Sequence, residues 1–102
     1  MDFNFPKIEG FEWDEGNLGH IKNHNVNFRE CEEIFVNKPL LINKDKAHSQ
    51  IEVRFQVLGI TNNRRGIFLA FTIRKNKIRV VSARDQNKSE RVRLKRLGGE
   101  IV

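Results

Sequence analysis

The stretch IEVRFQVLG, residues 51–59, alternates apolar and polar side chains almost perfectly. Successive side chains of a β-strand point to opposite faces of a sheet, so this stretch predicts a strand with one core face and one polar face. The expected core residues are Ile51, Val53, Phe55 and Val57, and the expected polar residues are Glu52, Arg54 and Gln56.

Two more strands follow in the chain. Residues 67–73 (IFLAFTI) are apolar enough for a central strand, and residues 78–84 (IRVVSAR) predict a strand with Arg79 on one face and Arg84 at its exit. Between these runs, residues 61–66 predict a hairpin loop and residues 75–77 a turn. With a short strand at residues 40–43, the runs predict an antiparallel four-stranded meander.

The chain before the meander predicts one short strand and two helices. The strand covers residues 11–13. Asp14 is a suitable N-cap for a helix that runs to about His24 and stops at Asn25, which tolerates the left-handed conformation. The second helix begins near Asn27 or Phe28, because Cys31, Ile34 and Phe35 give it an apolar stripe at helical spacing.

A basic helix is expected at residues 87–97, with Gly98-Gly99 as its stop. The expected fold class is therefore α+β: a short N-terminal strand, two helices, the antiparallel meander and a C-terminal basic helix.

Length and charge narrow the possibilities further. The 102 residues suit one domain, expected over residues 11–102 after a loose lead-in at residues 1–10. The net charge of +6 favours nucleic acid or an acidic protein as partner, although a basic surface without a specific ligand has the same composition. No apolar run approaches the roughly 20 residues of a membrane span, and the start lacks the apolar core of a secretory signal, so we expect a cytoplasmic protein.

The sequence offers little support for a metal site or for a catalytic serine or cysteine nucleophile. His20 and His24 have the i, i+4 spacing at which one helix face can ligate zinc, but Cys31 is the only thiol and no glutamate follows His20. Solvated or capping histidines are the favoured interpretation. Cys31 lies among glutamates that disfavour its thiolate, and no serine lies in a glycine elbow. We expect no metal and no cofactor.

The remaining candidate chemistry is that of guanidinium groups on a sheet. If Arg54, Arg74, Arg79 and Arg84 converge, they could bind a phosphodiester and stabilise the negative charge of its transition state. An RNA substrate supplies its own 2′-hydroxyl nucleophile, so the protein needs only to position it and to accept a proton, through Glu52 or a histidine. The alternative is that these are exposed strand residues paired across the sheet.

Several short motifs follow one another between residues 11 and 94. They are Phe11-Glu12-Trp13-Asp14, Asn17, His24, Val26, Phe28, Arg54 before Val57-Leu58-Gly59, Phe71-Thr72-x-Arg74, Arg79-Val80-Val81-Ser82-Ala83-Arg84 and Glu90-Arg91. In this order they closely resemble the BrnT toxin family. The resemblance implies a RelE-like fold and a ribonuclease toxin of a type II toxin–antitoxin pair, which cuts RNA without a metal cofactor and so inhibits translation. It also implies a hetero-oligomer with a small ribbon-helix-helix antitoxin similar to BrnA.

The resemblance and the chemistry together suggest residue roles. Arg79 and Arg84 would bind and polarise the scissile phosphate, with Arg54 or Arg74 completing the clamp. Glu52 or His24 would be the general base. The expected RNA-binding residues on the basic helix are Lys88, Arg91 and Arg93.

Two positions depart from the family pattern. Many relatives have Gly where this chain has Asn25 and Tyr where it has Leu94, and the chain contains no tyrosine. If that ring stacks on a base or shares in proton transfer in relatives, this chain would be a slower nuclease or inactive. The alternative function is therefore a non-catalytic basic module that binds RNA or protein, such as a decayed toxin.

Overall fold

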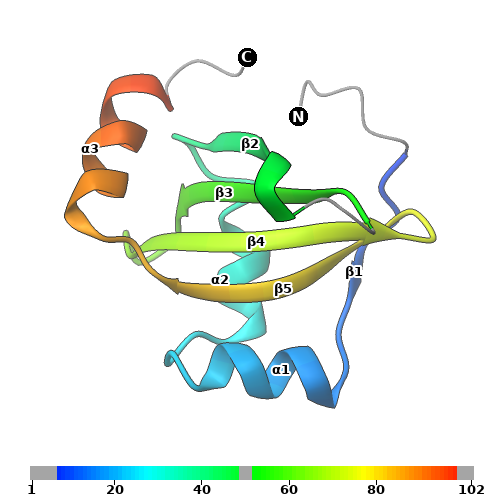
Figure 1. Ribbon diagram of the computed structural model, residues 1–102. Helices are drawn as coiled ribbons and strands as arrows, with labels where there is room; N and C mark the ends of the chain where they lie inside the picture. Colours follow the sequence, from blue (N-terminus) through cyan, green and yellow to red (C-terminus); the bar gives the residue numbers. More distant parts are fainter. Residues whose placement is uncertain (1–6, 49–51, 99–102) are drawn as a thin grey trace.

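A computed structural model describes residues 7–48 and 52–98. In chain order its elements are β1 (Phe11–Glu12), α1 (Glu15–Lys22), α2 (Phe28–Glu33), β2 (Leu41–Asp45), a 3₁₀ turn (Lys46–His48), β3 (Arg54–Ile60), β4 (Gly66–Arg74), β5 (Lys77–Asp85) and α3 (Lys88–Leu97). Within these residues the strands form one five-stranded sheet of order β1-β5-β4-β3-β2 (Figure 1). The expected α+β class is confirmed.

The sheet differs from the predicted meander in strand number and direction. β1 joins its edge parallel to β5, with Phe11 opposite Ile78, whereas β2 to β5 pair antiparallel in chain order. The sheet is therefore mixed, because the short N-terminal strand, which was expected separately from the meander, forms its fifth strand. The sequence pattern of β1 is too short to indicate which strand it pairs with, because its partner lies 67 residues away in the chain.

The prediction for residues 51–59 was wrong at its first end. β3 begins at Arg54, Val53 is 45% exposed, and Ile51 lies outside the described residues. Val53 nevertheless contributes its carbonyl, which accepts a hydrogen bond of 2.8 Å from the Thr72 hydroxyl. From Phe55 onward the alternation is confirmed, since Phe55 packs against the core and Val57 is fully buried.

Capping boxes begin all three described α-helices. The N-cap side chains of Asp14, Asn27 and Asn87 accept hydrogen bonds from the backbone N–H three residues later, and the side chains there bond back. Each box satisfies two backbone donors that a helix end would otherwise leave unpaired. The start of each helix is thus determined locally, and α1 ends at Lys22, two residues before the predicted His24.

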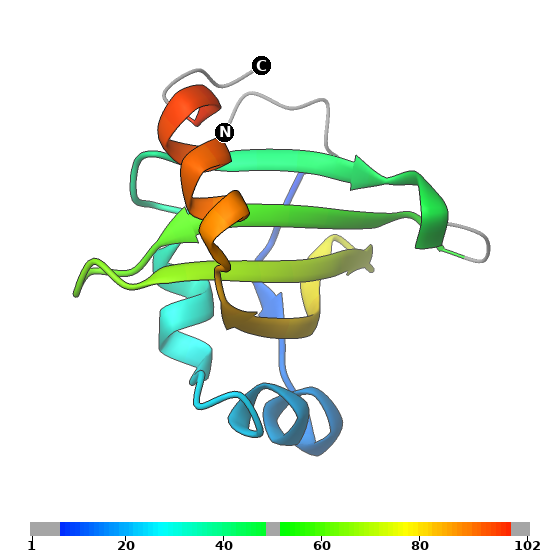
Figure 2. The ribbon, with the colours of Figure 1, turned by 60° about the vertical axis from the view of Figure 1, so that its left-hand side comes forward.

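The main core lies between the sheet and α2. Phe71, at the centre of β4, is fully buried, and Gly59 on β3 lets α2 approach so closely that an added Cβ would lie 2.9 Å from the Cβ of Ile34. α3 lies across one end of the opposite face, where Leu94 is 4% exposed (Figure 2). Among the described residues no α-helix covers the rest of that face, and we call it the open face.

A β-bulge decides which way the arginines of β5 point. Thr72 of β4 pairs with Arg79 and Phe68 with Arg84, although the two arginines are five residues apart. Regular alternation would place them on opposite faces. The register shifts at Val81, which has no Cα partner in β4, so both arginines face the open side.

Asn17 joins α1 to the sheet. Its buried side-chain amide donates to the carbonyls of Glu12 (2.9 Å) and Val80 (3.1 Å), and its Oδ1 accepts from the Asp14 N–H.

Part of the expected lead-in at residues 1–10 is bound to the sheet, since the Glu9 N–H donates to the Asn76 carbonyl. Residues 1–6 of that lead-in lie outside the described residues.

We expect Asn17→Ala to lower the free energy of unfolding by about 1–3 kcal/mol, because it leaves buried carbonyls without a donor and removes half of a capping box. Urea denaturation followed by Trp13 fluorescence measures the loss. Asn23→Ala is the matched control, since Asn23 is exposed at the other end of the same helix. An equal loss in both variants would contradict this role of Asn17.

Candidate functional site

A groove of about 230 Å³ lies where α1 meets the open face of the sheet. Its residues come from α1, the segment before β3, and the three central strands. They are Gly16, Asn17, His20, Glu52, Arg54, Thr72, Arg74, Arg79, Val80 and Val81. Three guanidinium groups and one carboxylate line it, so its formal charge is positive. We call it the arginine groove.

Arg79 is the most enclosed of the ion-paired groove arginines, with a side chain 18% exposed. Its Nη1 donates to the carboxylates of Glu12 (2.9 Å) and Asp14 (2.8 Å). The Arg79 hydrogen bond is the main cause that lowers the pKa of Asp14. Asp14 therefore stays ionised at neutral pH. Together with Glu12 it orients Arg79 along the groove.

Arg74 forms a bidentate pair with Glu52. Nε donates to one carboxylate oxygen (3.1 Å) and Nη2 to the other (2.8 Å). This hydrogen bond from Arg74 lowers the pKa of Glu52. A general base works best with a pKa near the operating pH, so the pair makes Glu52 a weaker proton acceptor. Both side chains are 40–49% exposed, so a ligand can reach the pair.

Arg84 lies outside the arginine groove. Its guanidinium stacks over the Phe68 ring at 4.1 Å and forms a bidentate pair with Glu90 of α3 (2.8 and 3.0 Å). Phe68 and Thr72, the partners of Arg84 and Arg79, are four residues apart on β4, which is roughly 13 Å along a strand. The structure thus brings together Arg54, Arg74 and Arg79 and places Arg84 in a separate row beside α3.

The two histidines of α1 differ in position. His20 lines the arginine groove, whereas His24 follows the helix and lies outside it. Their rings are 6.2 Å apart. Among the described residues, no group of three His, Cys, Asp or Glu side chains could hold a metal ion. The i, i+4 spacing indicates that the two histidines lie close together, but it does not indicate which of them lines the groove with the arginines.

The basic residues of α3 are placed along the helix surface. Lys88 and Arg93 line a shallow hollow of about 530 Å³ together with Ser89, Val92 and Arg96. Arg91 instead donates to the Gln86 carbonyl (2.9 Å). Within the described part of the chain, Arg93 Nε is buried without a hydrogen-bond partner. Of the three predicted RNA-binding residues, Lys88 and Arg93 thus share one surface.

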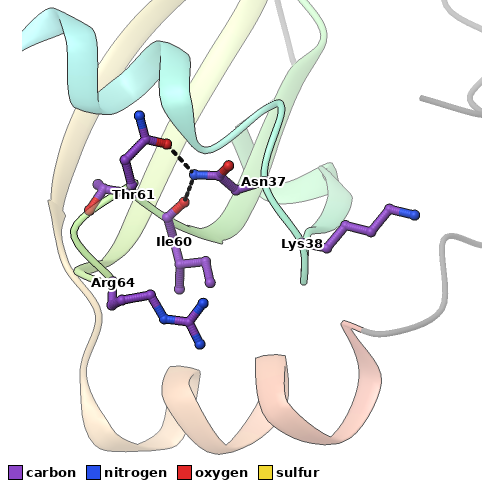
Figure 3. Close-up of a pocket in the computed structure, with 6 residues that line it drawn as sticks. Asn37, Lys38, Ile60, Thr61 and Arg64 are labelled. Atoms are coloured by element: carbon purple, nitrogen blue, oxygen red, sulfur yellow. Dashed lines mark hydrogen bonds between the residues drawn. The ribbon is translucent and has the colours of Figure 1, made fainter.

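A further hollow, of about 350 Å³, lies between the end of α2 and the β3–β4 hairpin (Figure 3). The Asn37 amide donates there to the Ile60 carbonyl (3.0 Å) and the Asn62 side chain (2.9 Å), so its N–H groups hold the hairpin. The Lys38 side chain extends away from Arg64 (Figure 3). This hollow lacks the converging cations of the arginine groove and contains none of the predicted site residues.

Cys31 has a structural role, as the sequence indicates. It is fully buried among core residues. Burial, and after it the charges of Glu30 and Glu32, raises the pKa of its thiol to about 12. The thiolate form is therefore not populated at neutral pH, and Cys31 is no nucleophile in this fold.

Comparison with known proteins adds the deciding observation. A family profile described as "Ribonuclease toxin, BrnT, of type II toxin-antitoxin system" matches residues 13–90. The chain belongs to the BrnT family. A comparison with curated proteins found no match.

The BrnT match contains every residue that lines the arginine groove. It also covers Asp14 and Glu52, the carboxylate partners of Arg79 and Arg74. Arg84 and its partner Glu90 lie within the match as well, whereas Glu12 lies one residue before it. It ends within the first turn of α3, before Arg91 and Arg93. Membership of a type II toxin–antitoxin family implies RNA as substrate and an antitoxin as partner. None of the described helices is long and apolar enough to cross a bilayer.

Proposed function

We propose that this BrnT protein is an endoribonuclease toxin that cleaves RNA without a metal ion, inhibits translation, and is neutralised by a small BrnA-like antitoxin. The observation that supports this most is the arginine groove, in which Arg54, Arg74 and Arg79 meet beside α1. We also propose that the fold is RelE-like and that the protein is located in the cytoplasm.

The chemistry would be transesterification. The 2′-hydroxyl of the substrate loses its proton and attacks the adjacent phosphorus, the bond from phosphorus to the 5′-oxygen breaks, and the 5′-oxygen takes a proton from water. The products are a 2′,3′-cyclic phosphate and a 5′-hydroxyl end. Arg79 and Arg54 would bind the scissile phosphate and stabilise its transition-state charge, since oriented cationic donors act most strongly where charge develops.

Arg84 would then contact a different phosphate of the same strand. Its row lies roughly 13 Å from that of Arg79, about two nucleotide steps along an extended backbone. Lys88 and Arg93 on α3 would continue this path by contributing sequence-independent attraction to the backbone. This arrangement divides the predicted arginines into a cleaving set in the groove and a positioning set beside α3.

The alternative is a non-catalytic basic module, suggested by Leu94 in place of the tyrosine found in many relatives. Leu94 is 4% exposed on the buried side of α3, whereas the arginine groove lies beside α1. The departure therefore affects helix packing more directly than the groove. For this reason we favour the ribonuclease over the module.

The proposed antitoxin would act by covering the basic open face. An acidic surface meeting this face would associate rapidly and in a salt-dependent manner. Of the two apolar residues after α2, Phe35 packs in the core, with its ring 5.5 Å from Phe71, while Val36 is 81% exposed. Val36 is thus exposed and Phe35 is not, but both follow α2 on the side of the sheet opposite the open face, so the contact proposed here is mainly electrostatic.

The test is cleavage of labelled total RNA by the purified protein in the presence of EDTA. We expect cleavage products with 2′,3′-cyclic phosphate ends, and none from an oligonucleotide that is 2′-deoxy at the cleaved position. Binding without cleavage, on free RNA and in a translation extract alike, would favour the non-catalytic module. Cleavage that stops with EDTA would contradict the metal-independent mechanism.

A second prediction concerns the carboxylates that compete with RNA for Arg79. Asp14→Asn retains a good N-cap but removes one negative charge bound to Arg79. We expect RNA affinity to rise several-fold at low salt, measured by fluorescence anisotropy with a 2′-deoxy oligonucleotide. Glu15→Gln is the matched control. Glu15 is the residue after Asp14 and is exposed, so the change removes the same charge at a neighbouring position of the helix. Equal effects of both changes would show only a general charge effect.

A further inference from the structure

The imidazole of His20 also lines the arginine groove. The arginines can bind a phosphate but cannot accept a proton, whereas a neutral imidazole can. We propose that His20 is the catalytic residue that accepts the 2′-hydroxyl proton during RNA cleavage. This inference rests on the proposed ribonuclease function and extends it by naming the general base.

The position of His20 is well defined by its helix. α1 is fixed to the sheet through Asn17, whose amide bonds two carbonyls, and His20 follows Asn17 by three residues, which places both on one helix face. Both residues line the arginine groove. The imidazole is therefore presented toward the arginines of the sheet by a helix that is itself anchored.

The other candidates are less suited to accept a proton. Glu52 is held by two hydrogen bonds from Arg74. These bonds occupy both oxygens of the carboxylate and favour its ionised form, so it accepts a proton less readily. His24 lies outside the groove, so a phosphate held by Arg79 would not bring a 2′-hydroxyl to it. Imidazole is the side chain that most often performs this proton transfer in enzymes.

The reaction balances with His20 as the acceptor. The proton moves from the 2′-hydroxyl to the imidazole while the bond from the 2′-oxygen to phosphorus forms. The bond from phosphorus to the 5′-oxygen breaks, and the leaving oxygen takes a proton from water. The imidazolium then returns its proton to the hydroxide that remains, so no other reactant is consumed.

The test compares wild type with His20→Gln and His24→Gln in cleavage of labelled RNA with EDTA present, across a range of pH. We expect His20→Gln to reduce the cleavage rate about 100-fold, the lower range for loss of a general base. The affinity for a 2′-deoxy oligonucleotide should stay the same, because the arginines remain. The wild-type rate should fall at acidic pH, and this acidic limb should disappear in His20→Gln.

The pH profile must be read against the charged groups that share the groove. These are Glu52 and Arg54, Arg74 on β4 and Arg79 on β5. Outside the groove, the His24 ring lies 6.2 Å from the His20 ring and is the other titratable group to consider. A His20→Ala variant tests the role without relying on pH, since added imidazole should restore part of its cleavage. A merely structural histidine would show no such rescue.

Three results are distinguishable. An unchanged rate and acidic limb in His20→Gln, with active wild type, would overturn the assignment of His20 and leave the ribonuclease intact. Loss of cleavage in His24→Gln alone would transfer the role to His24. Absence of cleavage by wild type on both free RNA and translating ribosomes would overturn the proposed function and this inference with it.

Discussion

Arg79→Ala should reduce RNA cleavage by about 10²–10³-fold, the loss typical when one oriented transition-state donor is removed. The carboxylates of Glu12 and Asp14 both orient Arg79, and its side chain is only 18% exposed. Initial rates on labelled RNA, together with growth arrest on expression, measure the loss. Retained toxicity in a variant that expresses and folds normally would contradict this role.

The same change also removes two ion pairs, so its effect on folding must be separated from its effect on cleavage. A double variant, Glu12→Gln with Asp14→Asn, removes the same charge pairs but keeps the guanidinium. We expect it to lose a similar amount of stability to Arg79→Ala but less cleavage, because the guanidinium is still present although it is no longer oriented by two carboxylates. An equal loss of cleavage in both variants would mean that the orientation of β1 against β5, rather than the guanidinium, determines activity.

Local signals in the sequence predicted the elements well. Asp14, Asn27 and Asn87 begin helices because each is followed three residues later by a side chain that completes a capping box. The turn at Lys75 and Asn76 was also predictable, and both residues have positive φ (50° and 65°), as two-residue hairpins require. Such signals act over three or four residues and are therefore visible in one sequence.

Features that depend on distant pairing were not predictable. The bulge at Val81 places Arg79 and Arg84 on one face, and no residue type near Val81 indicates it. The pairing of β1 with β5 and the partners of Arg79 likewise depend on the sheet. Four arginines could therefore be predicted as one set, whereas the folded chain separates Arg84 from the groove and places His20 of α1 in it.

The largest expected loss of stability is for Phe71→Ala, about 3–5 kcal/mol. Phe71 is fully buried, stacks on Phe55 with ring centroids 5.1 Å apart, and meets Phe35 edge to face at 5.5 Å. Truncation removes these contacts and leaves a cavity that the two sides of the core cannot close. Domains of this kind are stable by only about 5–15 kcal/mol, so a large part of the folding free energy would be lost. Urea denaturation, with Phe28→Ala as the matched control at a 41% exposed position, measures it.

This core change also tests how the groove is supported. Phe71 faces the core, while its neighbour Thr72 faces the arginine groove between Arg54 and Arg79. If packing beneath β4 positions the groove, Phe71→Ala should lower cleavage by more than its unfolded fraction explains, and Phe71→Leu should restore most of both properties. Cleavage that follows only the folded fraction would show that strand pairing alone positions the arginines, because the ladder hydrogen bonds of β4 persist when its core side chain is removed.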